Sequence, residues 1–443
     1  MVFKKTRISG LVAVALLVGS GTAMASGFAL IEQSGSGLGN AYAGGAASAE
    51  DASTIFYNPA GMARLKGMEI VVAASMIKPS AKFTDSGAST AATLQTKGGD
   101  GGDAGSWGLV PNAYFAMELN PQTRLGLGIN APFGLQTEYD STWMGRFQAI
   151  KSKIKTVNLN PAVSYDVNEM ISLGAGLNYQ RITGELTSAV NYSAAAFSAG
   201  GVPLLTAIGG PGKEGVSTVS GNDAAWGYNY GALFKLNPKT RIGVAYRSKI
   251  KYNLSGTVSF TNVPTALASS PKLQNGDVTL PITMPGSFSV SGIQQFDDQW
   301  DVMADATWTG WGIFKQLKID RTSGGNVQTV QENWKNTWRF SVGTSYHYNP
   351  QWMARAGLAF DQSPVSDTYR TARIPDNDRT WLSVGGQYKP TKESAVDFGY
   401  AHLFVKDSSI SSMQNTSTSA NGNLIGTYKN SVDIVSVQYA YSF

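Results

Sequence analysis

The sequence predicts an all-β protein, a 14-stranded antiparallel transmembrane β-barrel with an N-terminal hatch (plug) inside the lumen. Three features indicate this fold: an export signal at the N-terminus, an alternating strand at the C-terminus, and regular alternation of short and long connections between predicted strands. The expected division of the chain is a signal peptide over 1–25, a hatch over 26–65 and the barrel over 66–443.

The first 25 residues have the three parts of a secretory signal peptide. Cations between residues 4 and 7 precede an apolar stretch over 11–18, and Ala23–Ala25 fits the small-x-small pattern of a cleavage site. The apolar stretch is shorter than the ~20 residues that a membrane-spanning helix needs. We therefore expect export, with a mature chain that starts at Ser26. Such a chain enters a membrane only as a closed barrel, and a soluble secreted protein is the alternative.

The last eleven residues form a strictly alternating strand. Val435, Val437 and Tyr439 fall on one face, and Ser436 and Gln438 fall on the other. One face suits lipid and the other suits a wet lumen, as in a membrane barrel.

Alternation between turn signals predicts fourteen strands and places short turns and long loops at opposite rims. The predicted strands are 66–82, 106–118, 121–131, 148–166, 169–186, 221–236, 238–256, 283–296, 299–315, 335–348, 352–362, 379–388, 393–406 and 429–443. Tight turns such as Asn120-Pro121 and Asn349-Pro350 alternate with long connections, which is typical of barrels whose short turns are periplasmic. By the alternation, Arg339, Arg355 and Asp397 fall on the face that points into the lumen. A charged side chain there is less unfavourable than one facing lipid at the midplane, which costs ~2–4 kcal/mol.

Composition excludes several classes of function. The chain has no cysteine, so disulfides do not hold it together despite the predicted export. The formal charge of +5 falls to +2 once three signal-peptide cations are removed, too little to indicate nucleic-acid binding. The two histidines, His347 near a rim and His402 on the lipid phase, are poorly placed for a lipase, so no enzyme activity is expected. We expect neither a metal nor a cofactor, because no motif for one is present.

Residues 26–65 are rich in Gly, Ala and Ser and have no strand periodicity. Side chains alone would not fill the lumen of a fourteen-stranded barrel, so this segment is expected to fold inside it as a plug. A disordered periplasmic tail is the alternative.

Four blocks of sequence form a pattern specific to one family. They are Ser26-Gly27-Phe28-Ala29-Leu30 with Ser36-Gly37-Leu38-Gly39-Asn40-Ala41-Tyr42-Ala43-Gly44 and Asn58-Pro59-Ala60; Trp308-Thr309-Gly310-Trp311; Phe360-Asp361-Gln362-Ser363-Pro364-Val365; and Ile374-Pro375-Asp376-Asn377-Asp378-Arg379. In these blocks the chain resembles the FadL family of outer-membrane transporters of long-chain fatty acids and other hydrophobic compounds. The resemblance covers nearly the whole chain and implies a fourteen-stranded barrel with a hatch.

The resemblance also implies functional positions. Asn58, Pro59 and Ala60 match the hatch motif that the family needs for transport, although Asn-Pro is also common at ordinary turns. Pro132, Phe133 and Gly134 follow the third strand, where Pro removes a ladder donor and Gly permits a bend. In the family a kink here makes a lateral opening in the wall, with Gly134 at the kink position. An ordinary strand end is the alternative.

Two long loops, over 187–220 and 257–282, are unusually apolar and are expected to capture ligand. Their candidate contacts are Phe197, Leu204, Leu205 and Leu267, and a self-packed cap of loops is the alternative. By resemblance, Phe28 at the mature N-terminus is a further candidate contact.

The expected function is passive uptake of long-chain fatty acids into the outer membrane, with capture by the apolar loops and release by lateral diffusion through the wall. A carboxylate in an apolar cavity needs a basic partner, and Lys335 and Arg339 are the candidates. An uptake channel for aromatic or other uncharged compounds is the alternative, and a general porin is a further one. Expected partners are hydrophobic small molecules, outer-membrane lipids and the barrel-assembly machinery, which would read Phe443; the protein is expected to be a monomer.

Overall fold

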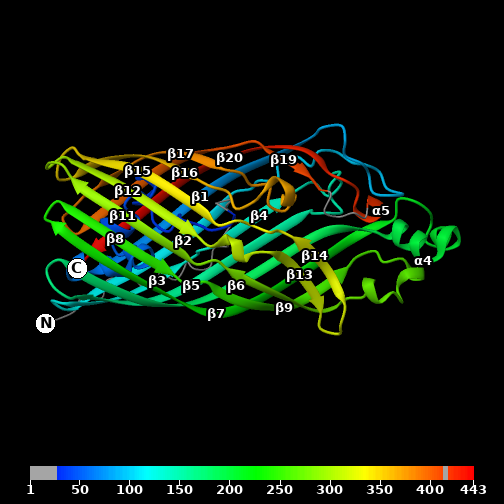
Figure 1. The fold of residues 1–443 in the computed structure, drawn as a ribbon, viewed down its shortest axis with the longest axis horizontal. Helices are drawn as coiled ribbons and strands as arrows, with labels where there is room; N and C mark the ends of the chain where they lie inside the picture. The colour runs from blue at the N-terminus through cyan, green and yellow to red at the C-terminus, as the bar shows by residue number, and fades with distance from the viewer. Residues whose placement is uncertain (1–26, 413–417) are drawn as a thin grey trace.

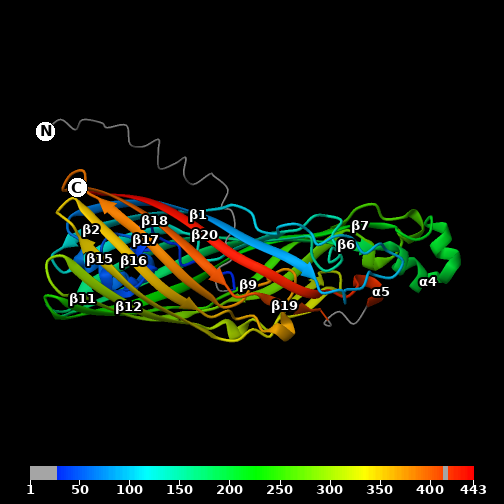
Figure 2. The same ribbon diagram turned by 90° about the horizontal axis from the view of Figure 1, so that it is seen from above.

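The computed structural model describes residues 27–412 and 418–443, which form one closed antiparallel β-barrel (Figures 1 and 2). The predicted signal peptide over 1–25 lies outside the described residues. β1 (Met68–Asp85) pairs with β2 (Gly108–Asn120) on one side and with β20 (Ile425–Ser442) on the other, and the second pairing closes the barrel.

Twenty strand elements among the described residues make up fourteen barrel strands, so the predicted number is confirmed. The other bounds are β3 (Thr123–Asn130), β4 (Gly134–Glu138), β5 (Lys151–Asp166), β6 (Ile171–Asn191), β7 (Glu214–Asn237), β8 (Thr240–Arg247), β9 (Ile250–Phe260), β10 (Gly276–Met284), β11 (Ser287–Gln295), β12 (Trp300–Thr309), β13 (Gln316–Arg321), β14 (Asn326–Gln331), β15 (Thr337–His347), β16 (Trp352–Asp361), β17 (Arg379–Tyr388), β18 (Ser394–Val405) and β19 (Ser408–Ser411). Six barrel strands are interrupted and contribute two elements each: β3 with β4, β8 with β9, β10 with β11, β12 with β13, β14 with β15, and β18 with β19.

The helical elements are short except for α4, which has 16 residues and is kinked at Gly200 and Gly201. They are η1 (Leu38–Asn40), α2 (Gly45–Ser48), α3 (Thr54–Tyr57), η2 (Pro59–Arg64), α4 (Tyr192–Ala207), η3 (Thr265–Leu267), η4 (Pro271–Leu273), η5 (Trp311–Ile313), η6 (Asp367–Tyr369) and α5 (Thr418–Asn421). None of the helices in the described residues has the length and apolar character needed to cross a membrane.

Several predicted boundaries are wrong at the long-loop end of the barrel, where α4 lies in Figure 1. The predicted loop after residue 315 contains the hairpin of β13 and β14, and β10 begins at Gly276 instead of 283. Pro281 has no backbone N–H and reads as a strand breaker, yet it lies within β10 opposite Asn253. At this end the inner face of β10 is apolar, with Val278 and Ile282 buried, so the polar lumen phase used to find the strands does not extend to their ends.

The outward faces of the strands carry the apolar side chains and the lumen carries the polar ones, as the sequence predicts. Val435 and Val437 are about half exposed, at 51% and 53%, whereas Ser436 and Gln438, which alternate with them, are buried. The predicted lumen charges Arg339, Arg355 and Asp397 are all buried. Outward-facing aromatic residues gather at two levels: Trp300 and Tyr346 mark the short-turn level, and Trp308 and Trp338 mark the long-loop level. Such girdles flank the lipid-facing band of membrane barrels.

Residues 27–65, here called the N-terminal segment, lie within the barrel. Gly35 donates from its main chain to the Gln438 side chain at 2.9 Å, and Ala46 donates to Ser291 at 3.0 Å. These two contacts reach different strands of the wall, β20 and β11. An ion pair from Arg355 to Glu50 at 2.7 Å, continued by Arg355 to Asp397 at 2.6 Å, adds a charged anchor. The segment is therefore tied to the wall at several places around the barrel.

Candidate functional site

The barrel wall is incomplete between β2 and β4. Residues 108–112 of β2 pair with β1 alone, because the pairing of β2 with β3 begins at Ala113. On the other side of this gap, β4 pairs with β5 alone. β3 and β4 part at 131–133, where Pro132 has no N–H to contribute to a ladder. We call this unpaired region the wall gap.

The N-terminal segment lies directly behind the wall gap. Leu30 donates from its main chain to the Pro132 carbonyl at 2.8 Å, and Gly134 donates to the Phe28 carbonyl at 2.9 Å. Gln33 donates from its side chain to the Ala131 carbonyl at 2.9 Å. The backbone groups released by the strand break are thus satisfied from inside the barrel.

Gly134, the predicted kink position, has close contact with this segment. A Cβ at Gly134 would lie 3.0 Å from the Leu30 Cδ1 atom, tighter than most real contacts. Its lack of a side chain lets the N-terminal segment approach the wall.

Phe28 is the centre of an aromatic cluster that divides the lumen. Its ring centroid lies 4.7 Å from that of Trp311, 5.6 Å from Trp334 and 6.2 Å from both Phe133 and Phe314. We call these five residues the aromatic septum. Phe28 and Phe314 line one cavity toward the long loops, and Trp311 and Phe133 line a second cavity nearer the middle of the barrel.

The loop-side cavity has apolar walls and three ionisable groups, Lys153, Glu332 and Arg373. Its apolar lining includes Leu135, Ile154, Ile182, Leu254, Ile282 and Leu317. Arg373 uses only Nη1 in its hydrogen bonds, to Ser152 Oγ at 3.0 Å and the Lys151 carbonyl at 3.1 Å. Its remaining guanidinium N–H groups have no hydrogen-bond partner among the described residues.

Burial changes the ionisation of Glu332 and Arg373. It raises the pKa of Glu332 to about 8 and lowers the pKa of Arg373 to about 10. Glu332 also accepts a hydrogen bond from Trp334 Nε1 at 2.9 Å. At neutral pH the cavity therefore contains a charged Arg373 beside a Glu332 that is mostly neutral.

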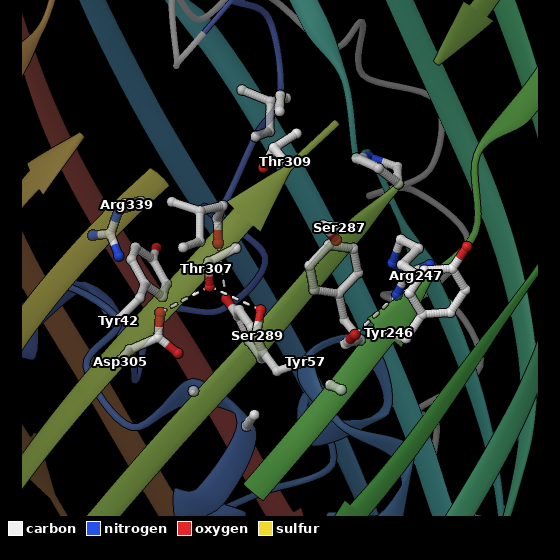
Figure 3. A pocket seen from close by; sticks show the side chains of 18 of the residues that line it. Tyr42, Tyr57, Tyr246, Arg247, Ser287, Ser289, Asp305, Thr307, Thr309 and Arg339 are labelled. Atoms are coloured by element: carbon white, nitrogen blue, oxygen red, sulfur yellow. Dashed lines mark hydrogen bonds between the residues drawn. The ribbon is translucent and has the colours of Figure 1, made fainter. Parts of the chain in front are cut away.

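The mid-barrel cavity is more polar (Figure 3). Arg339 donates to the Ala41 carbonyl at 2.7 Å and its guanidinium carbon lies 5.0 Å from the Trp381 ring centroid. Thr307 donates to Asp305 at 2.8 Å and shares a 2.8 Å hydrogen bond with Ser289. The predicted site residue Arg339 thus lines a cavity, in contact with the N-terminal segment.

Asn58 fixes the motif that begins η2. Its Oδ1 accepts from the Ala60 N–H at 3.0 Å, and its Nδ2 donates to the Ala46 carbonyl at 2.7 Å and to the Ala232 carbonyl of β7 at 3.1 Å. Pro59 occupies the first turn of η2, where its missing N–H costs nothing. Gly231 makes room for this motif, because a Cβ there would collide with Asn58 Oδ1.

The remaining predicted contacts lie outside the two cavities. Leu205 and Leu267 come from different loops and are buried in one hydrophobic cluster, and Leu204 packs at its edge. Phe197 of α4 is 48% exposed. Lys335 is exposed and lines neither cavity.

Sequence reasoning missed Arg373, Glu332 and the two tryptophans of the septum. Arg373 immediately precedes the 374–379 block, so its position in the sequence was a usable signal; Glu332 and Trp334 had none, because they lie in a loop without periodicity. Within the described residues no group of His, Asp and Glu side chains could hold a metal ion.

The fold and the site together define a class: an outer-membrane β-barrel transport protein whose lumen contains its own N-terminal segment. The family model "Outer membrane protein transport protein (OMPP1/FadL/TodX)" matches residues 16–443. The chain belongs to this family and is accordingly an outer-membrane protein.

Its relatives span nearly the whole chain. It is 33% identical over 412 residues to the long-chain fatty acid transport protein of Escherichia coli K12, covering 88% of this chain and 90% of that protein. It is 34% identical over 414 residues to outer membrane protein P1 of Haemophilus influenzae, with 89% of each chain covered.

Solved structures agree on the fold. A FadL homologue of Pseudomonas aeruginosa aligns with a TM-score of 0.83 at 26% identity, covering 94% of this chain and 99% of that one. The Pseudomonas putida toluene transporter TodX aligns with a TM-score of 0.65 at 18% identity, over the same shares of each chain. The second likeness is informative about the fold alone.

Proposed function

We propose that this protein carries out passive uptake of long-chain fatty acids across the outer membrane. The observation that carries the proposal is the loop-side cavity, which joins an apolar wall to one charged guanidinium with unused donors. An alkyl chain suits the wall, and a carboxylate suits Arg373, because bidentate pairing with carboxylates is characteristic of Arg. The relatives named as fatty acid transport proteins support the same substrate class.

The proposed route follows the order of the sites along the barrel. Apolar loops with Phe197, Leu204, Leu205 and Leu267 capture the ligand, which then enters the loop-side cavity beside Phe28. Movement of the N-terminal segment, acting as a hatch over 26–65, would open the aromatic septum. The ligand would reach the mid-barrel cavity, where Arg339 offers a second cation, and leave through the wall gap at 132–134 into the membrane.

The hatch motif has a structural part in this route. Asn58, Pro59 and Ala60 would hold the far side of the segment against β7 while residues 28–33 break their hydrogen bonds to the wall gap and move. Lys335, exposed at the long-loop end, is at most an early contact for the carboxylate.

A second candidate is uptake of uncharged hydrophobic compounds such as toluene. The apolar side chains of the loop-side cavity favour it, because a wall of Leu135, Ile182 and Leu254 suits a hydrocarbon that has no charged group. The fold likeness to the toluene transporter adds no weight to this candidate at its low identity.

The test is uptake of labelled oleate and labelled toluene by cells that lack their own hydrophobic transporter, with and without this chain. Oleate uptake alone supports the first proposal, and toluene uptake alone supports the second. Uptake of neither, together with steady ion conductance in planar bilayers, would favour a porin and overturn both.

The proposed partners beyond the substrate are few. Outer-membrane lipids surround the barrel and receive the product, and the barrel-assembly machinery would recognise the C-terminal Phe443, whose side chain is 59% exposed. We propose a monomer, because one chain closes the wall and contains both cavities.

A further inference from the structure

We propose that the outer face of the barrel has a binding site for the phosphorylated headgroup of an outer-leaflet glycolipid, at the seam of β1 and β20. Two lysines, Lys82 and Lys429, form its centre. The inference rests on the outer-membrane location and the contacts of this seam, and it is independent of the transported substrate.

Both lysines point away from the lumen. On β1 the neighbours Ala81 and Phe83 are buried while Lys82 is exposed, and on β20 Tyr428 is buried while Lys429 is exposed. Because side chains of a strand alternate between faces, the two ammonium groups lie on the outer surface.

The two lysines are directly opposite each other in the β1–β20 register. Like charges at directly opposed positions destabilise a strand pair. Neither lysine has an ion-pair or side-chain hydrogen-bond partner among the described residues. On the other side of β1, Lys82 is opposite Asp103 across an isolated bridge, and the Asp103 carboxylate accepts from Ser80 Oγ, the Ala81 N–H and the Gly105 N–H at 2.8 to 3.0 Å. An anion between the two lysines, on the side of Lys82 away from Asp103, would relieve the repulsion between the ammonium groups.

Hydroxyl groups flank the lysine pair on the same face. Thr84 pairs with Thr427 on the long-loop side, and Ser80 pairs with Ser431 on the other side. Ser80 already donates to Asp103, so Thr84, Thr427 and Ser431 are the hydroxyls that can join the two ammonium groups as donors to a phosphate.

The height of this site fits a headgroup. Ser431 pairs with Phe404 of β18, an outward aromatic residue that is 56% exposed, so the lysines lie one outward position beyond the aromatic level. Toward the membrane centre the same face carries Lys78 opposite Asp433, and Asp433 also bonds to Tyr400 at 2.7 Å and to His402 at 2.8 Å. Beyond this pair the face continues with Met76, Val435 and Val437, all at least 40% exposed. A cationic end above an apolar strip complements an amphiphile with an anionic head, and basic clusters at this level are typical of lipid headgroup recognition.

The experiment compares the full barrel, extracted from outer membranes in mild detergent, with the K82Q/K429Q variant. Co-purified phosphorylated glycolipid is counted by native mass spectrometry. We expect the wild type to retain the phosphorylated glycolipid. Each lysine removed should weaken its binding roughly fivefold, so K82Q/K429Q should retain less of it. The control is K389Q/K392Q, which removes the same charge from the exposed turn between β17 and β18. Heat-dependent migration on gels confirms that each variant is a folded barrel.

Rebinding to delipidated protein identifies the ligand. Diphosphorylated glycolipid should bind, and the same lipid after enzymatic dephosphorylation should bind at least about fivefold more weakly. Equal retention by K82Q/K429Q, or equal binding of the dephosphorylated lipid, would overturn the proposal. Displacement by millimolar inorganic phosphate or by oleate would also overturn it, in favour of a site for free anions.

Discussion

The main-chain N–H of Gly134 in the wall donates to the carbonyl oxygen of Phe28 in the N-terminal segment at 2.9 Å. One residue thus belongs both to the break between β3 and β4 and to the contact that covers it. Movement of the segment away from the wall would break this bond and separate the aromatic septum at the same time.

Replacing Phe28 by Ala should open the septum. Truncating a buried Phe typically costs ~3–5 kcal/mol, because the surrounding side chains relax only partly into the space left behind. We expect Phe28→Ala to raise single-channel ion conductance in planar bilayers above that of the wild type. Phe197→Ala, on the exposed side of α4, is the control and should leave the conductance unchanged. Wild-type conductance in Phe28→Ala would argue that the septum does not separate the two cavities.

Arg373 should decide the affinity for carboxylates. Removing one partner of a charge-assisted hydrogen bond costs ~1.5–3 kcal/mol, so Arg373→Ala should weaken oleate binding by about 10- to 150-fold. Binding of toluene should change little, since toluene has no group for the guanidinium. Arg373→Lys should rescue part of the loss through its charge.

Lys335→Ala provides the comparison for Arg373→Ala, because both substitutions remove one cation from the long-loop end of the barrel. Tryptophan fluorescence titration should detect binding near Trp334. Equal losses in the two variants would show that long-range attraction, and not a specific carboxylate contact, governs affinity.

Anion binding should weaken as pH rises through the pKa of Glu332. That pKa is raised to about 8 by burial, so Glu332 is mostly neutral at pH 7 and negative at pH 9. Arg373, with a pKa of about 10, stays mostly charged over this range. The new negative charge repels an anionic ligand and compensates Arg373, so affinity should fall about tenfold, equivalent to ~1.4 kcal/mol.

An alkyl sulfonate is the appropriate ligand for this titration, because it does not itself change charge between pH 6 and 9. Glu332→Gln should bind with the same affinity at both ends of the range. A pH dependence that survives in Glu332→Gln would assign the titration to another group.

Gly231→Ala should loosen the N-terminal segment while leaving the barrel folded. The new methyl group would collide with Asn58 Oδ1, and overpacking of this kind typically costs ~1–3 kcal/mol. We expect faster protease cleavage or hydrogen exchange within 27–65 and unchanged heat-dependent migration of the barrel. The matched control is Gly292→Ala in β11, whose Cβ would meet its nearest neighbour, the Arg241 carbonyl oxygen, only at 4.0 Å. Equal rates of cleavage and hydrogen exchange within 27–65 in the two alanine variants would contradict this role of Gly231.

The barrel itself could be predicted from the sequence because lipid on one side and water on the other impose a two-residue period. This explains why the phase of Arg339, Arg355 and Asp397 was predictable. Arg373, Glu332 and Trp334 lie in loops where no such solvent boundary acts, and their meeting depends on three-dimensional packing. The kink at Pro132 was predictable from its missing N–H, but the hydrogen bonds that Phe28 and Leu30 supply to it were not.

Closing β1 against β20 sets a condition on assembly. Glu69 and Ser442 meet across this seam with 373 positions of chain between them, as in their 3.1 Å side-chain hydrogen bond. Contacts so distant along the chain form late. The N-terminal segment is made before any strand, yet it must be inside when the last strand docks on the first. The N-terminal segment must therefore enter before β1 and β20 pair during biogenesis. A barrel that closed earlier would leave this segment outside the lumen.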